Sequence, residues 1–307
     1  MYRPSTSSKP ADRARLAFVD IPSRIEVLHA RFECHEFVTH AHDTWSIAAV
    51  VSGAQDIAPR GAPSHVATAG QIYALPPDAP HAGRPLAEHC EYVMLYVPND
   101  EWRAQCSANG VDPACLPNTA LKDTSTATLL ADFVNRIMRR SVEVSAWSGE
   151  WVTLCESLLR PYRDACVDVR RPRPMHGDPG LARAVDYLRT HWNRNVLLDE
   201  VANEASVSTF ELCRRFMAAF GLTPHRYQLV LRVTNAKIRL LRGARISDVA
   251  CEVGFADQSH LGRHFKAILG VTPGAVAKEA IFLSRFDEQR GLPQSISRTS
   301  ALDFRSI

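Results

Sequence analysis

Residues 246–273 read ISDVACEVGFADQSHLGRHFKAILGVTP and residues 198–224 read LDEVANEASVSTFELCRRFMAAFGLTP, so one pattern occurs twice in the chain. The offset between matching positions is 48 residues in the first part of the pattern and 49 in the second. This change of one residue falls between two helical segments, where a turn can absorb it. The matching pairs include Val201/Val249, Ala202/Ala250, Leu212/Leu261, Arg214/Arg263, Phe216/Phe265, Gly221/Gly270 and Pro224/Pro273. The repeat predicts two helix–turn–helix units, an arrangement suited to reading two neighbouring segments of DNA.

Each unit has the residues that a short helix, a turn and a second helix require. In the first unit, the hydroxyl of Ser208 can cap the second helix by accepting a free backbone N–H. In the second unit, Gly254 permits the positive φ of a tight turn, and Asp257 can cap the helix that follows. The apolar residues of the two second helices that we expect to face inward are Leu212, Phe216, Phe220, Leu261, Phe265 and Ile268.

The second helix of each unit is the part that enters a major groove, with its N-terminal residues leading. Arg214 and Arg263 occupy equivalent outward positions, and arginine can pair with guanine through two hydrogen bonds, so we expect both to read bases. Arg215, His264 and Lys266 lie further round their helices, where contact with phosphate is expected. The predicted DNA-binding residues are Thr209, Phe210, Cys213, Arg214, Arg215, Gln258, Ser259, Arg263, His264 and Lys266.

A spacer helix is predicted between the two units, over residues 227–241. It would hold the two reading helices in successive grooves, about 34 Å apart. The alternative is a helical domain that binds no DNA, since a single arginine is most often a solvated surface charge. The duplication and the matched arginines together favour DNA binding.

Charge is distributed unevenly along the chain, although its net charge is only +3. Residues 1–120 contain 9 Lys/Arg and 13 Asp/Glu, whereas residues 181–280 contain 14 and 9. A basic second half is typical of a segment that contacts nucleic acid, with chance variation as the alternative. No apolar run reaches the roughly 18 residues of a membrane span, and the eight cysteines form no C-x-x-C pair. We therefore expect a cytoplasmic protein without a membrane partner.

The chain divides into segments of different pattern, which predict an α+β multidomain protein. Short apolar runs between Gly, Pro and polar turns indicate a β domain. Two helical stretches follow, which either form a dimer seam or cap the β domain. The predicted segments are a disordered lead over 1–20, the β domain over 21–120, a helical hairpin over 121–169, a Pro- and Gly-rich linker over 170–180, an all-α double helix–turn–helix domain over 181–280 and a flexible tail over 281–307.

The segment from Ile246 to Pro273 follows I-x-x-V-A-x-x-x-G-F-x-D-x-S-x-L-x-R-x-F-K-x-x-x-G-x-T-P. This resembles the signature of the AraC/XylS family of bacterial transcription regulators, and the resemblance covers residues 181–280. The departures are Leu261, where the family often has an aromatic residue, and Ser206, which replaces the turn glycine of the first unit. The resemblance implies promoter DNA and RNA polymerase as partners, with activation or repression of nearby genes. A homodimer would present four reading helices.

Three histidines of the β domain form a set. His40 and His42, then His81 after a glycine–proline segment, resemble the cupin motifs H-x-H…G and G-x5-P-x4-H. AraC-like regulators commonly carry such a barrel as a sensor, so the resemblance implies a small-molecule effector. Three converging histidines could bind a divalent metal ion, hydrogen-bond an organic effector, or only pack. Cupin enzymes usually add a glutamate at a position that falls here near Ser46, so we expect an effector site with neither a metal nor another cofactor.

Aromatic residues are expected to complete this effector site, as a barrel mouth with a few polar groups among aromatic side chains. Each of them could instead belong to the core. The predicted effector-binding residues are His40, His42, Trp45, Tyr73, His81, Tyr92 and Tyr96. The sequence thus indicates an effector-modulated, DNA-binding transcription regulator without catalytic residues. The alternatives are a metal-dependent cupin enzyme and an effector-independent DNA-binding protein.

Overall fold

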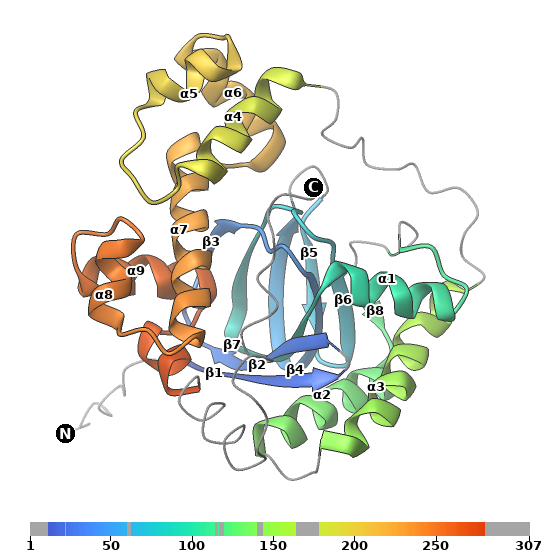
Figure 1. Ribbon diagram of the computed structural model, residues 1–307. Helices are drawn as coiled ribbons and strands as arrows, with labels where there is room; N and C mark the ends of the chain where they lie inside the picture. Colours follow the sequence, from blue (N-terminus) through green and yellow to red (C-terminus); the bar gives the residue numbers. More distant parts are fainter. Residues whose placement is uncertain are drawn as a thin grey trace, which may run out of the picture.

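The computed structural model describes residues 12–21, 23–59, 63–113, 116, 120–139, 144–163 and 178–279. They form a β domain, a pair of helices against one face of it, and a C-terminal helical domain (Figure 1). The predicted fold class is confirmed. The predicted flexible tail and most of the predicted linker lie outside the described residues.

The β domain is one antiparallel sheet in the order β1–β2–β7–β4–β6–β8, with β3 paired to β7 and β5 paired to β4. The path is cupin-like, but in the part of the chain described here it does not close into a full ring. The strands are β1 (Arg13–Ile21), β2 (Ser23–Phe32), β3 (Phe37–His40), β4 (Trp45–Pro59), β5 (His65–Thr68), β6 (Gln71–Leu75), β7 (His81–Val97) and β8 (Leu121–Lys122).

The first strand corrects one prediction, because residues 13–20 were expected to belong to a disordered lead. They form most of β1 instead and pair with β2 over its whole length. Leu16, Ala17 and Val19 are buried in this strand. The edge of β2 supplies backbone partners and the two faces of the sheet supply apolar contacts, which a reading of local composition does not reveal.

One face of the sheet is covered by helices, as Figure 1 shows for α2 and α3 below the strands. These helices and α1 share a core with the sheet, in which Trp102, Phe133 and Trp151 are fully buried. The apolar side of the hairpin is therefore used against the sheet. The bounds are α1 (Asn99–Ala108), α2 (Thr124–Arg139), α3 (Val144–Leu159) and the short 3₁₀ helix η2 (Arg160–Tyr162).

The C-terminal domain places two helical units at the two ends of one long helix, α7 (Figure 1). The helices are α4 (Pro179–Thr190), α5 (Leu198–Ala205), α6 (Thr209–Phe220), α7 (Pro224–Leu241), α8 (Ile246–Glu252) and α9 (Gln258–Leu269). The predicted spacer helix is thus confirmed, beginning three residues earlier than expected. Its 18 residues give a length of about 27 Å at the usual helical rise.

The two helical units bury their apolar residues in different places. The first unit packs with α4 in a core of its own, around Leu212 and Phe216. The second unit packs with α7 against the other face of the sheet, so that Leu261 and Phe265 share one core with Tyr73 and Tyr92 of the β domain. The second unit is therefore part of the wall of the sensor domain.

Candidate DNA-reading helices and effector cavity

The two helix–turn–helix units have matching turns and caps. The Ser208 hydroxyl accepts the backbone N–H of Glu211 at 3.2 Å, and the Asp257 carboxylate accepts that of His260 at 2.7 Å, so both predicted caps are confirmed. The turn residues also match, because Gly254 and Ser206 both have positive φ, of 82° and 58°. A serine there carries strain that glycine avoids.

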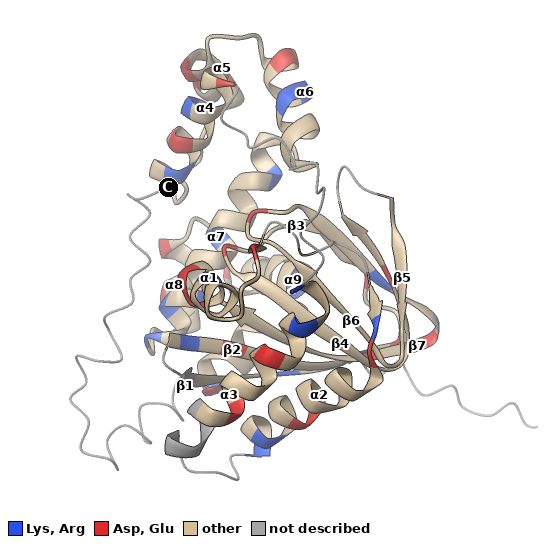
Figure 2. Cartoon of the chain, turned by 90° about the vertical axis from the view of Figure 1, so that its right-hand side faces the viewer, with Lys and Arg blue, Asp and Glu red and all other residues tan. Residues whose placement is uncertain are grey.

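On α6 the outward residues include one large apolar side chain and a paired arginine. Phe210 is 79% exposed at the start of the helix, where a major-groove contact with a thymine methyl group is feasible. Arg214 is exposed, but its guanidinium donates two hydrogen bonds, both 2.7 Å long, to the carboxylate of Glu211. Figure 2 shows this adjoining acidic and basic stretch on α6. Arg214 must therefore release Glu211 before it can pair with a base.

Arg215 has a different environment from the one predicted. It is half-buried, donates two 3.0 Å hydrogen bonds to Asp178 at the start of α4, and also pairs with Glu211 at 2.7 Å. These partners attach α6 to α4. They favour a positioning role over the expected phosphate contact, because a guanidinium with two carboxylate partners has little capacity left for DNA.

On α9 the predicted residues also separate into two groups. Gln258, Ser259 and Arg263 are exposed, and among the residues that the structure describes Arg263 forms no ion pair. His264 is half-buried in stacked contact with Phe255, and burial lowers its pKa, so it is neutral at pH 7. Lys266 is near enough to Asp12 of the β domain to lower the pKa of that carboxyl. The first three residues are therefore available to DNA, whereas Lys266 is on the side of the sensor domain.

Two residues of α7 that sequence reasoning missed hold the helical domain together. Arg232 is 8% exposed and donates hydrogen bonds to the carbonyl oxygens of Trp192, Arg194 and Gly254. Gln228, 3% exposed, donates to the carbonyl of Arg194 at 2.8 Å. A charged residue on the apolar side of a predicted helix was the available signal, because a buried arginine requires several acceptors.

The β domain contains a cavity of about 350 Å³ on the face of the sheet that the helical domain covers. Six of the seven predicted effector residues line it, namely His40, His42, Tyr73, His81, Tyr92 and Tyr96. Sequence reasoning missed further lining residues, including Phe37, Gln55 and Met94. Gln55 is buried and accepts a 3.0 Å hydrogen bond from the hydroxyl of Tyr73, so the cavity wall contains a fixed polar pair.

Trp45 is the prediction that the structure corrects. It lies in the core on the opposite face of the sheet, 6.3 Å from Trp102 between ring centroids, and its indole N–H donates to Asn99 at 3.1 Å. Along β4, residues at odd positions such as Ile47 face that core, whereas Ala48 faces the cavity side. The alternation was readable from the sequence, but not which face carries the cavity.

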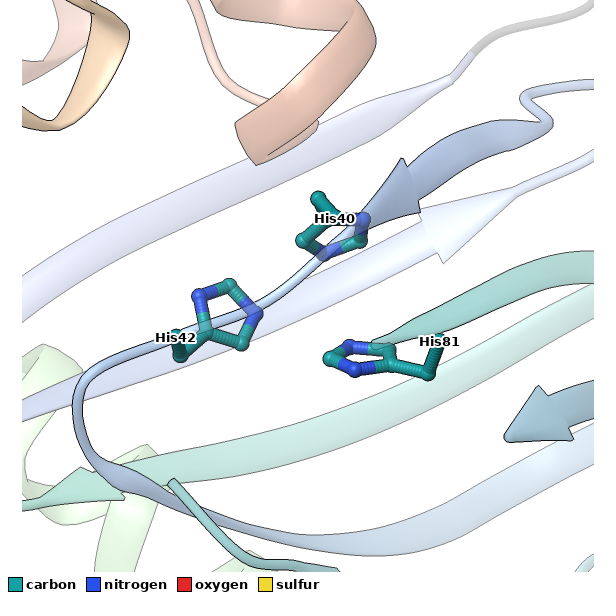
Figure 3. Close-up of side chains that lie close together, drawn as sticks. All are labelled: His40, His42 and His81. Carbon is teal, nitrogen blue, oxygen red and sulfur yellow. The ribbon is translucent and has the colours of Figure 1, made fainter. Parts of the chain in front are cut away.

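The three histidines converge at the edge of this cavity (Figure 3). His40 at the end of β3 pairs with His81 at the start of β7, so the two rings lie side by side with centroids 4.5 Å apart. The ring of His42 lies 4.8 Å from that of His40 and 5.3 Å from that of His81. In each residue a ring nitrogen is within 4.8 Å of those of the other two.

The cluster is composed of neutral imidazoles. Burial lowers the pKa of His40 to about 3 and holds the pKa values of His42 and His81 below their usual range. The Nδ1–H of His40 donates to the carbonyl of Val38 at 2.7 Å, and that of His81 donates to the carbonyl of Ala79 at 2.9 Å. Because Nδ1 carries the proton in both rings, Nε2 has a free lone pair.

An interdomain ion pair lies next to the cluster. Lys237 of α7 binds Glu26 of β2 at 2.6 Å, with both side chains largely buried. The same ammonium group lies 5.7 Å from the centroid of the Tyr96 ring, which in turn is 4.9 Å from the ring of His42. The positive charge of Lys237 contributes to the lowered pKa of His42. The cavity and the helical domain are thus electrostatically in contact.

Comparison with known proteins identifies both halves of the chain. Residues 23–148 match the AraC-like ligand binding domain, and residues 201–279 match a helix-turn-helix domain. The chain belongs to the AraC family of transcription regulators. None of its described helices is long and apolar enough to cross a membrane.

The relatives of this regulator agree with the assignment. It is 24% identical over 255 residues to the uncharacterized HTH-type transcriptional regulator YbfI of Bacillus subtilis, covering 81% of this chain and 90% of YbfI. It is 30% identical over 129 residues to the transcriptional regulator MtrA of Neisseria gonorrhoeae, covering 40% and 42% of the two chains. An apo ToxT variant from Vibrio cholerae has a similar fold, with a TM-score of 0.53 at 12% identity, over 89% of this chain and 98% of ToxT. This likeness supports the two-domain architecture.

Proposed function

We propose that this AraC-family regulator reads promoter DNA with the N-terminal halves of α6 and α9. The observation that carries the proposal is the pair of matched, capped helices with exposed arginines at equivalent positions, Arg214 and Arg263. The exposed residues Phe210, Gln258 and Ser259 would accompany them in the groove. Thr209 and Cys213, half-buried on α6, would contribute at the edge of this surface.

The effector site proposed for the regulator is the cavity beneath the helical domain. Its lining combines neutral histidines and tyrosine hydroxyls with apolar side chains, which suits a small ligand held by a few hydrogen bonds. A ligand there affects DNA binding only if it binds one arrangement of the two domains better than another. The shared core and the Glu26–Lys237 pair are the contacts through which such a preference would act.

Several partners follow from this proposal and from the family. We infer that the regulator acts in the cytoplasm, contacts RNA polymerase at its promoter and has no catalytic residues. We also retain a homodimer through the 121–169 hairpin as a proposal. The outward surfaces of α2 and α3 would supply it, since their apolar side already packs on the sheet.

The test is a mobility-shift titration with DNA from upstream of the regulator's own gene. We expect a sequence-selective complex whose affinity falls steeply with salt, because each phosphate contact releases counterions. Scrambled DNA of the same length is the matched control. Equal affinity for both DNAs would contradict sequence-specific reading, and the absence of any complex would contradict DNA binding.

A further inference from the structure

The histidine cluster has the geometry of a metal site with an open position. Three imidazole nitrogens around a tetrahedral ion at about 2.05 Å are roughly 3.4 Å from one another. The ring nitrogens of His40, His42 and His81 are already within 4.8 Å of one another. Small rotations of the rings would bring them to the required separation without moving a strand.

Two of the three rings are already in the form that a metal ion requires. His40 and His81 each donate Nδ1–H to a backbone carbonyl, of Val38 and Ala79, which fixes the ring and presents the Nε2 lone pair. This second hydrogen bond is the usual outer support of a metal-binding histidine. His42, half-buried, closes the set from the segment after β3. A purely structural cluster would not need matched anchors on two separate strands.

The donor set also defines the class of ion. Among the described residues the cluster contains three imidazoles and no carboxylate. Imidazole suits zinc, copper, nickel and iron, whereas magnesium and calcium require oxygen ligands. With three protein ligands, the remaining coordination position would face the cavity that Gln55 and Tyr73 line.

We propose that His40, His42 and His81 bind one divalent transition-metal ion, and that this ion is a signal to which the DNA-binding domain responds. The second part rests on the proposed function, whereas the first does not. It replaces the sequence-based expectation of a site without metal by a specific effector class.

Two contacts connect such an ion to the helical domain. First, a dication at His42 would repel the ammonium group of Lys237, which lies against the far side of Tyr96 and is bound to Glu26. Second, His40 ends β3, the strand against which α9 packs. Phe37 of the same strand lies 5.8 Å from the His40 ring between centroids and also touches Gly270 at the end of α9.

Metal binding is tested with Co²⁺ on the full chain after removal of bound metal with a chelator. Visible absorption bands of four- or five-coordinate cobalt should reach saturation at one ion per chain, and Zn²⁺ should displace them. His42→Ala should weaken binding by at least about 100-fold. His42→Gln, which keeps a similar volume, gives a second reading if the alanine variant unfolds. His89→Ala is the control, since its ring binds Ser52 outside the cluster.

Three results would overturn the site. These are an unchanged cobalt spectrum in both His42 variants, no saturable spectrum at all, or the charge-transfer band of a thiolate ligand. The last result would place the ion at cysteines such as Cys34 or Cys251, which are exposed.

The signalling part is tested by repeating the mobility shift with and without Zn²⁺. We expect the affinity for promoter DNA to change by about fivefold or more, and DNA to change the Co²⁺ affinity by the same factor, since coupling is reciprocal. Lys237→Met should keep the cobalt spectrum and reduce the coupling. An unchanged DNA affinity in a protein that binds both ligands would overturn the signalling part alone. Failure to bind DNA would contradict the proposed function and leave the cobalt result standing.

Discussion

The two helix–turn–helix units have the same local fold but different surroundings. The first packs only with α4, α5 and α7, in a core of its own around Phe216. The second shares its core with the sheet, and α9 lies against β3. The duplication therefore preserved the reading helix and its caps, whereas contact with the sensor was given to one copy. A signal from the cavity reaches the second unit directly and the first only through α7.

The reading arginines differ in the same way. Arg214 is held by Glu211 in a two-hydrogen-bond fork, whereas Arg263 has no ion-pair partner among the described residues. The turns also differ, with Ser206 in the first unit and Gly254 in the second. The unit that contacts the sensor is thus the one with the less strained turn and the more available arginine. Three substitutions test this contrast.

Gly254→Ala should have the largest effect. With φ of 82°, a Cβ at this position would lie 2.7 Å from the carbonyl oxygen of Asn193 and 3.0 Å from Cζ of Arg232. Strain and overpacking together predict a loss on the order of 3 kcal/mol in the free energy of unfolding. Denaturant unfolding followed by circular dichroism measures it. Gly243→Ala is the matched control, since it has φ of 83° but no atom within 4 Å of the new Cβ. An equal loss in the two variants would show that packing around Gly254 contributes nothing.

Arg263→Ala should have the next largest effect, on DNA binding and not on folding. We expect preference at one base pair to relax, at about 1–3 kcal/mol of specific binding. Arg214→Ala should cost less, because the wild-type arginine must first leave Glu211, and an exposed pair is worth about 1 kcal/mol at most. Mobility-shift titrations on single-base operator variants measure both.

Glu211→Gln provides the control for this difference. It should bring the two arginines closer in importance by freeing Arg214, while Asp178 continues to hold Arg215. Uniform weakening of Arg263→Ala on all DNA sequences would instead make Arg263 a phosphate contact. A larger cost for Arg214→Ala than for Arg263→Ala would reverse the contrast between the two units.

Local patterns predicted much of the reading unit, because caps and turns depend on neighbouring residues. Ser208, Asp257 and Gly254 were each identified from a few positions of sequence. Contacts between distant segments were not predictable in this way. Lys237 and Glu26 are 211 residues apart, and neither sequence neighbourhood indicates the other. Trp45 was assigned to the cavity because alternation separates two faces of a strand without saying which one a second domain covers.

Ser206→Gly should have the smallest effect and the opposite sign. The serine has φ of 58° and ψ of 42°, a conformation that costs an L-residue roughly 1–2 kcal/mol. Glycine relieves that strain but gains about 0.5–1 kcal/mol of conformational freedom in the unfolded chain. The hydroxyl also accepts only a long, 3.4 Å hydrogen bond from Arg183 at the surface. The net expectation is a gain of about 0.5 kcal/mol in the free energy of unfolding, measured by denaturant titration. Ser206→Ala separates the causes, because it removes the hydroxyl and keeps the Cβ. Glycine should be the more stable variant if the first turn is strained, and an alanine variant of equal or greater stability would mean that the two turns are equivalent.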